Sequence, residues 1–512
     1  MSSSSAAALA ERERNRVLRR ADWRYLLPDA APRRALCLAG PALREACAVV
    51  ADRVDDTAQP GVRYDLVVAE DPDDRTRRAI PGALDPSGVC YSEWSAHVPG
   101  AAGRARRAME QSGLLDARSY RPWPSLGQCS VWVPTDGVAA RWWWRSATRP
   151  TDVRRVQLRA TLGALQSRLG VHGRVAVVAR GVDARNELHL VSVAREHGVL
   201  AESSDFASLL LTPGARSVGK VILLSFAGDA PAVAIKTARI PYAARGVELE
   251  ADLLDVVHAQ HAGVLPGAPL VLFRARALDT TVVGESALTG VPLLALLDAH
   301  RYASIAARVT DWLVRLAQPA TSAPRRSAWE SVAGPAFERF AAEFGAIVDE
   351  TALSRTRTLL ATLGALPVVA EQRDFSPWNV FEGDAGLVVL DWESGVADGL
   401  PALDLIYFIT HAAFYLERAW VSGRFAEAHR AAWSRDTAIG RVNLACTQRY
   451  FAALEVSADL LPALRLLAWV LHSHSDWIHR RDDAGAVPDA EALRDSRFLL
   501  LFREELAMLG RS

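Results

Sequence analysis

The sequence predicts two architectures in one chain: an open α/β sheet over about the first 150 residues, and an α+β region over the C-terminal three fifths. Three observations lead to this prediction. Before residue 150, short apolar runs alternate with helix-like segments, a pattern typical of strands and helices that follow one another. A strand-like run returns near residue 231, and a helix-like pattern follows it. Beyond residue 404 the apolar stretches are those of helices. A chain of 512 residues is long enough for two to four domains.

The elements of the α/β region follow from this alternation. We expect helices over 6–20 and 41–54, and strands over 35–40, 64–70, 88–94, 128–133 and 138–144. The last two strands would form a hairpin over the turn at 134–137, whose Pro, Asp and Gly favour a turn. Residues 151–205 are expected to be a connector, with a helix over 152–169, a strand over 173–179 and a helix that ends near His197.

A group of polar residues in the C-terminal third points to chemistry. Asp374 and Asn379 are separated by four residues, and Asp391 ends the apolar strand 388–390. Phosphoryl transfer from ATP needs a carboxylate that accepts the proton of the attacking hydroxyl, and oxygen ligands that hold Mg²⁺ against the phosphates. Asp374 fits the first role, and Asn379 and Asp391 fit the second. An Asp and an Asn five positions apart also arise by chance in long chains, so the nearby strand end matters for this interpretation.

The second group comes from the lysines. Lys and Arg total 59, yet only Lys220 and Lys236 are lysines. A retained lysine indicates a place where a compact ammonium is needed. Lys236 ends the strand-like run 231–236, and a helix-like segment over 247–254 follows it. We predict that Lys236 contacts phosphates and pairs with Glu250, or, as a second choice, with Glu248.

Together these motifs resemble the aminoglycoside phosphotransferase and choline kinase group of small-molecule kinases, over roughly residues 206–512. The resemblance implies a bilobal protein-kinase-like fold, with an N-lobe over 206–290 and a helical C-lobe over 291–512. It implies ATP and Mg²⁺ as cofactors, and a sugar, amino alcohol or antibiotic hydroxyl as acceptor. It also implies that Asp404 braces the catalytic loop. The expected cofactor-binding residues are Lys236, Glu250, Gly214 and Gly219 of the phosphate-covering turn, and Glu285 and Ala287 of an adenine-binding hinge.

Two departures from this family leave a second interpretation open. Where the family has a His two residues before the catalytic Asp, this chain has Gln372, which hydrogen-bonds but carries no charge. Asp391 is followed by Trp392 and Glu393, and no Phe-Gly follows it. These changes suggest as an alternative a pseudokinase that binds nucleotide and acts as a scaffold. Because Asp374, Asn379 and Asp391 are intact, an active enzyme is the preferred interpretation.

The N-terminal region resembles the later strands of a class I methyltransferase, with 64–70 and 84–94 as the matching segments. The cofactor loop departs from that family, because Gly40 is followed by Pro41, which lacks an N–H donor. We therefore expect a Rossmann-like domain that binds no S-adenosylmethionine. A methyltransferase with a regulatory kinase-like part stays open as an alternative. On this interpretation, a fragment that starts near Thr148 should keep nucleotide binding.

Composition limits the remaining functions. The formal net charge is zero, which argues against a nucleic-acid partner. No run is long enough to span a bilayer and no signal peptide is evident, so a cytoplasmic protein is expected. Five widely spaced cysteines support neither zinc nor thiol-redox chemistry. His472, Asp476 and His479 share a helix face, but a metal site there is disfavoured. Trp142, Trp143 and Trp144 either pack in their own core or offer the N-terminal domain a protein partner.

Overall fold

The computed structural model describes residues 14–126, 129–147, 154–201, 207–213, 219–319, 323–484 and 487–510, with the side chains of 154–160 and 483–484 excepted. Its contacts group the chain into two compact units. The first, which we call the sheet unit, comprises Arg12–Glu248 and Val271–Ala287. The second, the helical unit, comprises Leu249–Leu270 and Leu288–Ser512. The predicted regions 1–150, 151–205 and 206–290 thus lie largely in the sheet unit, and 291–512 lies in the helical unit.

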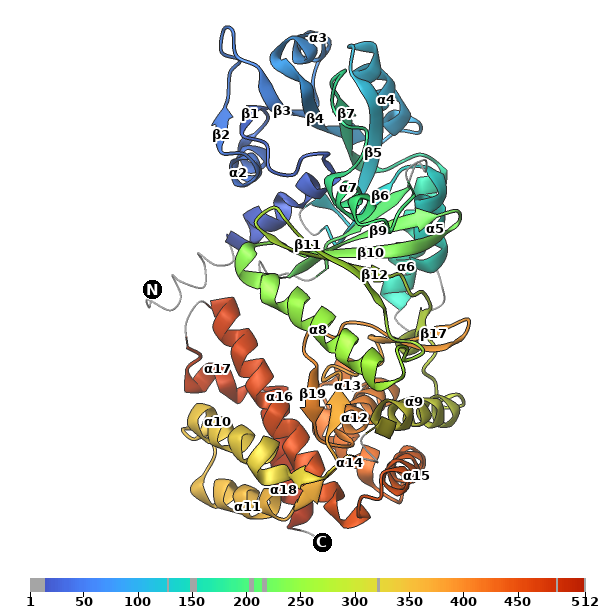
Figure 1. Ribbon diagram of the computed structural model, residues 1–512, viewed down its shortest axis with the longest axis vertical. Coiled ribbons are helices and arrows are strands. Elements are labelled where there is room, and N and C mark those ends of the chain that lie inside the picture. Colours follow the sequence, from blue (N-terminus) through green and yellow to red (C-terminus); the bar gives the residue numbers. More distant parts are fainter. Residues whose placement is uncertain are drawn as a thin grey trace. The chain divides into compact units, whose positions relative to one another are not determined.

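One continuous sheet of twelve strands forms the sheet unit, in the order β11-β12-β10-β9-β8-β6-β5-β7-β4-β3-β1-β2 (Figure 1). The strands are β1 (Arg34–Leu38), β2 (Arg53–Asp55), β3 (Tyr64–Glu70), β4 (Leu84–Ala96), β5 (Leu115–Trp123), β6 (Val131–Pro134), β7 (Gly173–Arg180), β8 (Ser208–Leu211), β9 (Lys220–Ala227), β10 (Ala230–Ala238), β11 (Val271–Ala277) and β12 (Thr280–Ser286). Strands β2, β1, β3 and β4 are parallel, and every other neighbouring pair is antiparallel. The pairing of β6 with β8 joins the N-terminal strands to the strands around Lys236.

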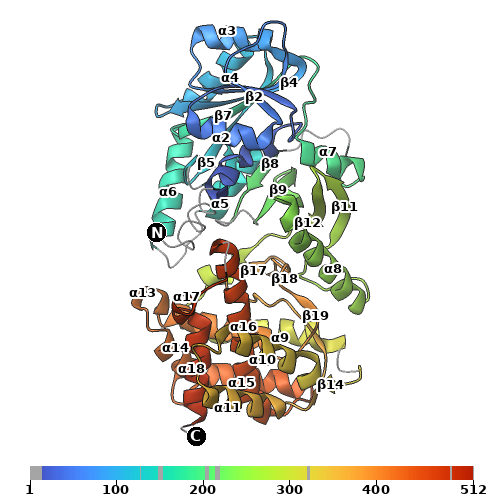
Figure 2. The same cartoon turned by 90° about the vertical axis from the view of Figure 1, so that its left-hand side faces the viewer.

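Both faces of the parallel part are apolar, as expected for a parallel sheet that helices cover on both sides. Successive residues alternate between two cores: Cys37 and Val68 belong to one, and Leu36 and Val67 to the other. The helices of this unit are η1 (Asp22–Leu26), α2 (Pro41–Val50), α3 (Asp74–Ala83), α4 (Ala101–Gln111), α5 (Gly137–Ala147), α6 (Arg154–Arg168), α7 (His189–Glu196) and η3 (Pro241–Ala243). Helices α2 and α7 cover the first core and α4 the second (Figure 2).

Most of the predicted elements are found, and one has the wrong type. The predicted strand 64–70 coincides with β3, and the predicted helix 41–54 is found over 41–50 as α2, whereas its last two residues belong to strand β2. The predicted strand 138–144 is wrong, because these residues form helix α5. Tryptophans favour strands, but the neighbouring Ala and Arg residues favour helix, and Ala140 and Trp144 are buried one helical turn apart. The tryptophans pack within their own unit: Trp144 meets Trp123 edge to face at 5.2 Å.

The start of the described chain is anchored to the end of β10. The Arg239 guanidinium, fully buried, pairs with Asp22 of η1 at 2.8 Å, and Arg24 donates to the Arg239 carbonyl at 2.6 Å. Arg239 follows Lys236 by only three residues. The N-terminal residues therefore belong to the same packed body as the strands that carry the predicted phosphate-binding lysine.

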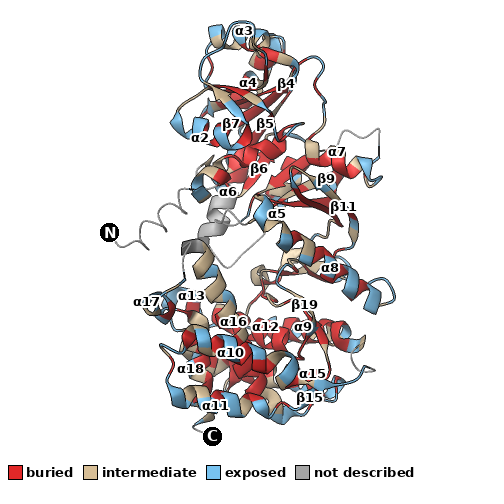
Figure 3. Ribbon diagram, turned by 60° about the vertical axis from the view of Figure 1, so that its left-hand side comes forward, coloured by how far each residue is buried: buried red, intermediate tan, exposed pale blue. Residues whose placement is uncertain are grey.

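The second unit consists mainly of helices. Figure 3 shows its buried residues in red. Helix α12 is buried at every residue from Leu403 to Phe414, so it forms the centre of this core. The helices are α8 (Ala244–Gln260, in this unit from Leu249), η4 (Leu293–Ala295), α9 (Tyr302–Ala317), η6 (Trp329–Ala333), α10 (Gly334–Phe344), α11 (Glu350–Ala361), α12 (Leu403–Leu416), α13 (Ala419–Ser422), α14 (Phe425–Trp433), α15 (Ala438–Ala453), η7 (Ala458–Leu460), α16 (Leu461–Ala484), α17 (Ala490–Arg494) and α18 (Arg497–Leu509).

Short strands hold the predicted catalytic segment. They are β13 (Val291–Pro292), β14 (Arg326–Ser327), β15 (Ala365–Leu366), β16 (Val369–Glu371), β17 (Val380–Gly383), β18 (Gly386–Val389) and β19 (Val396–Gly399). Strands β17 and β18 form a hairpin, and β16 pairs with β19. The segment between β16 and β17 contains Asp374 and Asn379, and Asp391 comes two residues after β18. The β17–β18 hairpin brings the chain back to this loop, so Asp391 lies near Asp374, which is 17 positions earlier in the chain.

Candidate phosphotransfer site

The residues of the D-x-x-x-x-N motif contact each other directly. The Asn379 side-chain amide donates to the carboxylate of Asp374 at 2.8 Å and to its backbone carbonyl at 3.0 Å. The Leu390 N–H donates to the Asn379 carbonyl at 3.0 Å, which ties the end of β18 to the loop. Asp391, the next residue, has a φ of 66°, a left-handed conformation that non-glycine residues adopt with strain. The structure therefore brings all three predicted catalytic and metal residues into one network.

Gln372 links the two acidic segments. Its side-chain oxygen accepts the Asp374 N–H at 2.9 Å, and its side-chain nitrogen donates to the carbonyls of Leu390 at 3.1 Å and Asp391 at 2.5 Å. An amide supplies the donor and the acceptor that both contacts need, without a charge. Gln372 thus connects the loop around Asp374 to the segment that ends at Asp391.

Two further carboxylates, those of Asp404 and Glu371, hold the start of this loop in place. Asp404, at the start of α12, accepts the backbone N–H groups of Gln372 at 2.7 Å and Arg373 at 2.8 Å. Glu371 accepts the Leu400 N–H at 2.5 Å and pairs with the Arg373 guanidinium at 3.2 Å. Arg373 itself has a φ of 66°. These contacts hold the loop backbone in a conformation that it would not favour alone, and they agree with the bracing role predicted for Asp404.

The Asp374 carboxyl lies in an electrostatic setting suited to proton transfer. Burial raises its pKa to about 7, and the negative charge of Asp391 acts in the same direction. A general base is most effective when its pKa lies near the working pH. The Tyr407 hydroxyl of α12 interacts with the same carboxylate and lowers its pKa, against the larger effect of burial. Tyr407 was not among the residues predicted from the sequence, because no motif links it to the loop.

The donor set at this point fits Mg²⁺. Asn379 uses its amide nitrogen on Asp374, so its amide oxygen is the atom it can offer to a cation. Asp391 adds a carboxylate beside it. Mg²⁺ prefers oxygen ligands and is held by one or two protein groups together with substrate phosphates. Across the described residues, no cluster of three or more His, Cys, Asp or Glu side chains is arranged to hold a metal ion.

Glu250 of α8 contacts the segment that follows Asp391. Its carboxylate is fully buried and accepts the Trp392 N–H at 3.1 Å, one residue after Asp391. The predicted pairing of Glu250 with Lys236 joins residues of different units and stays a prediction. Glu248, the second choice, accepts a hydrogen bond from Thr281 of β12 at 2.6 Å.

Within the sheet unit, Lys236 has a partner that the sequence did not suggest. Its ammonium pairs with the Glu285 carboxylate at 2.6 Å, and both side chains are buried. The register of β10 against β12 causes this contact, because Ala234 lies opposite Glu285 and the lysine side chain reaches back along the strand. A buried lysine that pairs with a buried carboxylate is held in a defined position.

Of the other residues predicted to bind nucleotide, Ala287 and Gly219 make backbone hydrogen bonds within the chain, and Gly214 is not described. The Ala287 N–H already donates to the Ala232 carbonyl at 3.0 Å, so this donor has a partner within the chain. The Gly219 carbonyl accepts the Arg239 N–H at 3.2 Å. Gly214 lies outside the described residues. In the N-terminal strands, the Gly40 N–H meets the Glu70 carboxylate at 3.3 Å, at the start of α2 where a bound anion would otherwise lie.

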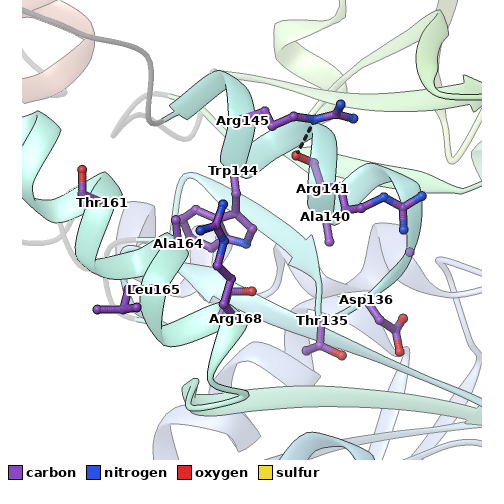
Figure 4. A pocket seen from close by; sticks show the side chains of 12 residues that line it. Thr135, Asp136, Ala140, Arg141, Trp144, Arg145, Thr161, Ala164, Leu165 and Arg168 are labelled. Carbon is purple, nitrogen blue, oxygen red and sulfur yellow. Dashed lines mark hydrogen bonds between the residues drawn. The ribbon is translucent and has the colours of Figure 1, made fainter.

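A separate cavity of about 790 Å³ opens between α5 and α6 of the sheet unit (Figure 4). Trp144, Ala140, Ala164 and Leu165 form its apolar wall, and Arg141, Arg145 and Arg168 lie around it. None of the residues predicted for phosphoryl transfer lines this cavity.

Among the described helices, none has the length and hydropathy of a membrane span.

No protein-family model matches the chain, and no curated protein matches its sequence. Solved structures that it resembles are small-molecule kinases and phosphotransferases. A macrolide 2'-phosphotransferase from Brachybacterium faecium is 17% identical, with 59% of this chain and 97% of that chain covered and a TM-score of 0.33. A choline/ethanolamine kinase family protein from Mesorhizobium loti is 14% identical over 63% of this chain and 100% of its own, with a TM-score of 0.36.

A third such structure is an aminoglycoside phosphotransferase from Streptomyces rimosus in complex with ADP and streptomycin. It is 14% identical over 49% of this chain and 90% of its own, with a TM-score of 0.29.

Proposed function

We propose that this protein is an ATP- and Mg²⁺-dependent phosphotransferase that acts on a hydroxyl group of a small molecule. The observation that carries the proposal is the network of Asp374, Asn379 and Asp391, with Gln372 bonded to both acidic segments. A purely structural turn would not need two carboxylates and an amide oxygen on one side of a braced, strained loop. The same groups are those that phosphoryl transfer requires.

In the proposed reaction, the acceptor oxygen attacks the terminal phosphorus of ATP, the bond to ADP breaks, and Asp374 takes the hydroxyl proton. Asn379 and Asp391 would hold Mg²⁺, which supplies positive charge to the phosphate oxygens. Lys236, kept in place by Glu285, would contact the same phosphates. Glu250 would act indirectly by fixing the backbone that follows Asp391. We propose a protein-kinase-like arrangement for these groups.

Release of ADP from MgATP tests this proposal in the presence of a panel of sugars, amino alcohols and antibiotics. We expect release that depends on Mg²⁺ and on one class of acceptor, with a phosphorylated acceptor as the second product. A protein that binds ATP but releases no ADP with any acceptor would favour the pseudokinase alternative. Micromolar binding of S-adenosylmethionine would favour the methyltransferase alternative, against which the carboxylate of Glu70 at the Gly40 amide is the main structural argument.

A further inference from the structure

A cluster of aromatic side chains begins at the proposed catalytic base. Tyr407, whose hydroxyl influences the pKa of Asp374, has its ring centre 4.0 Å from that of His411. His411 is 5.5 Å from Trp378, which belongs to the same loop as Asp374. Trp378 in turn is 6.3 Å from Trp420 of α13. Trp420 is 44% exposed, so the cluster reaches the surface of the helical unit.

Arg497, the first residue of α18, closes this cluster. Its guanidinium carbon lies 4.2 Å from the centre of the Trp420 ring and 5.8 Å from that of Phe498. The Phe498 ring is 6.4 Å from the Tyr407 ring. A continuous series of contacts thus leads from Asp374 through Tyr407, His411, Trp378 and Trp420 to Arg497, and back through Phe498. The guanidinium stands over Trp420 in the position that a ligand cation would take in an aromatic cage.

Two of the three guanidinium nitrogens of Arg497 make no hydrogen bond within the described part of the chain. Its Nε and Nη1 atoms are shielded from solvent and have no hydrogen-bond partner there. Asp476 attracts it at a distance, but the Asp476 carboxylate bonds to Arg480 at 2.8 Å. Charged donors without acceptors destabilise a fold, so such a group indicates a place that another molecule completes.

The other ionisable groups of the cluster add no positive charge. Burial lowers the pKa of His411 to about 3, and it also holds the pKa of His472, stacked on Tyr407 at 4.1 Å, well below its usual value. Both imidazoles are therefore neutral near pH 7. A cationic acceptor would meet the Arg497 guanidinium as a like charge, whereas a carboxylate or phosphate would supply the missing acceptors in a two-pronged geometry.

We propose that the phosphate acceptor is a hydroxyl-bearing small molecule with an anionic group, a carboxylate or a phosphate ester, which Arg497 binds while Trp378, Trp420 and Phe498 hold its carbon skeleton. This inference rests on the phosphotransferase function proposed above. It excludes polycationic aminoglycosides as the preferred acceptors. The hydroxyl of the bound molecule would face Asp374, which takes its proton as the new phosphate ester and ADP form.

Thermal unfolding with matched aromatic probes tests the site without any chemistry. Benzoate and phenyl phosphate carry the two anionic groups on a ring, and benzyl alcohol and benzylamine are their neutral and cationic counterparts. We expect at least one of the anions to raise the melting temperature of the full chain, and benzylamine to have no effect. The better anion of the two identifies the acceptor group. A melting temperature that neither anion changes would overturn the proposal.

Variants of Arg497 assign the effect to this residue. In Arg497→Gln we expect the affinity for the stabilising anion to fall roughly tenfold to hundredfold, and in Arg497→Lys to fall less, because an ammonium keeps the charge but not the planar fork. Arg494→Gln, an exposed position in α17, is the matched control and should bind like the wild type. Equal affinities in Arg497→Gln and Arg494→Gln would overturn the proposal, and circular dichroism confirms that each variant is folded.

Turnover separates this inference from the function on which it rests. Transfer of phosphate to neutral alcohols alone, without an effect of either anion, would keep the phosphotransferase function and overturn the anionic acceptor. Anion binding that depends on Arg497, without ADP release for any acceptor, would keep the site and overturn the phosphotransferase function.

Discussion

At the scale of single residues, Gln372 makes hydrogen bonds that a side chain of the same shape with one different atom cannot make. Gln372→Glu replaces the donor to the Asp391 carbonyl by a second acceptor, with little change in shape. A lost hydrogen bond of this kind costs about 1–3 kcal/mol, so we expect kcat/KM to fall on the order of 5–150-fold. Gln372→His keeps both a donor and an acceptor, and should retain most activity. Steady-state kinetics across a Mg²⁺ titration would show the difference, and equal rates in the two variants would contradict it.

The two lysines make a second residue-scale comparison. Lys236→Arg should lower kcat by roughly tenfold or more, because the larger planar group does not fit the buried position beside Glu285 and aims its donors differently. Lys220→Arg, at the half-buried start of β9, should be tolerated. Turnover and melting temperature are measured for both. Similar activity of the two variants would refute the argument from lysine scarcity.

At the scale of elements, α6 can pack closely on Trp123 and Trp144 because residue 163 is a glycine. A Cβ at Gly163 would lie 2.5 Å from the Trp123 ring and 2.9 Å from the Trp144 ring, whereas a Cβ at Gly82 of α3 would contact nothing. Gly163→Ala should therefore lower stability by about 1–3 kcal/mol, and Gly82→Ala should leave it unchanged or raise it by up to about 1 kcal/mol. Denaturant unfolding checks both variants. A more stable Gly163→Ala variant would show that α6 does not pack on these tryptophans.

Contacts between residues that are close in the chain can be predicted from the sequence, whereas contacts set by strand register or helix packing cannot. Asp374, Asn379 and Asp391 were predictable because a loop and one hairpin bring together residues that are close in the chain. The Lys236–Glu285 pair and the contact of Tyr407 with Asp374 were not, because strand register and the packing of α12 decide them. The segment 138–144 was assigned to a strand because its aromatic residues mimic a strand, while its burial has the four-residue spacing of a helix.

At the scale of the whole molecule, the continuous sheet changes the expectation for a fragment that starts near Thr148. Such a fragment would lose β6 and leave the edge of β8 unpaired at Leu210 and Leu211. It would also remove Asp22 from the buried Arg239 guanidinium, a loss that typically costs about 3–5 kcal/mol. We now expect the fragment to be insoluble or unfolded, where the sequence alone suggested that it would bind nucleotide. A soluble, nucleotide-binding fragment in gel filtration and calorimetry would contradict this.

The long-range pairing of β6 with β8 was beyond reach of the sequence, since no local pattern specifies which strands become neighbours. Its consequence is that the N-terminal strands and the strands around Lys236 should unfold together. The strands before residue 150 thus belong structurally to the same sheet as the strands around Lys236.

The most direct test of the central claim is phosphate transfer from γ-labelled ATP by Asp391→Asn and Asp384→Asn, measured with the best acceptor. Both changes remove one carboxylate from the β17–β18 hairpin region, but Asp384 is exposed in its turn and Asp391 lies beside Asn379 and Asp374. We predict wild-type transfer by Asp384→Asn and a loss on the order of 10²–10⁴-fold or more in Asp391→Asn. Full transfer by Asp391→Asn would contradict the assignment of the site.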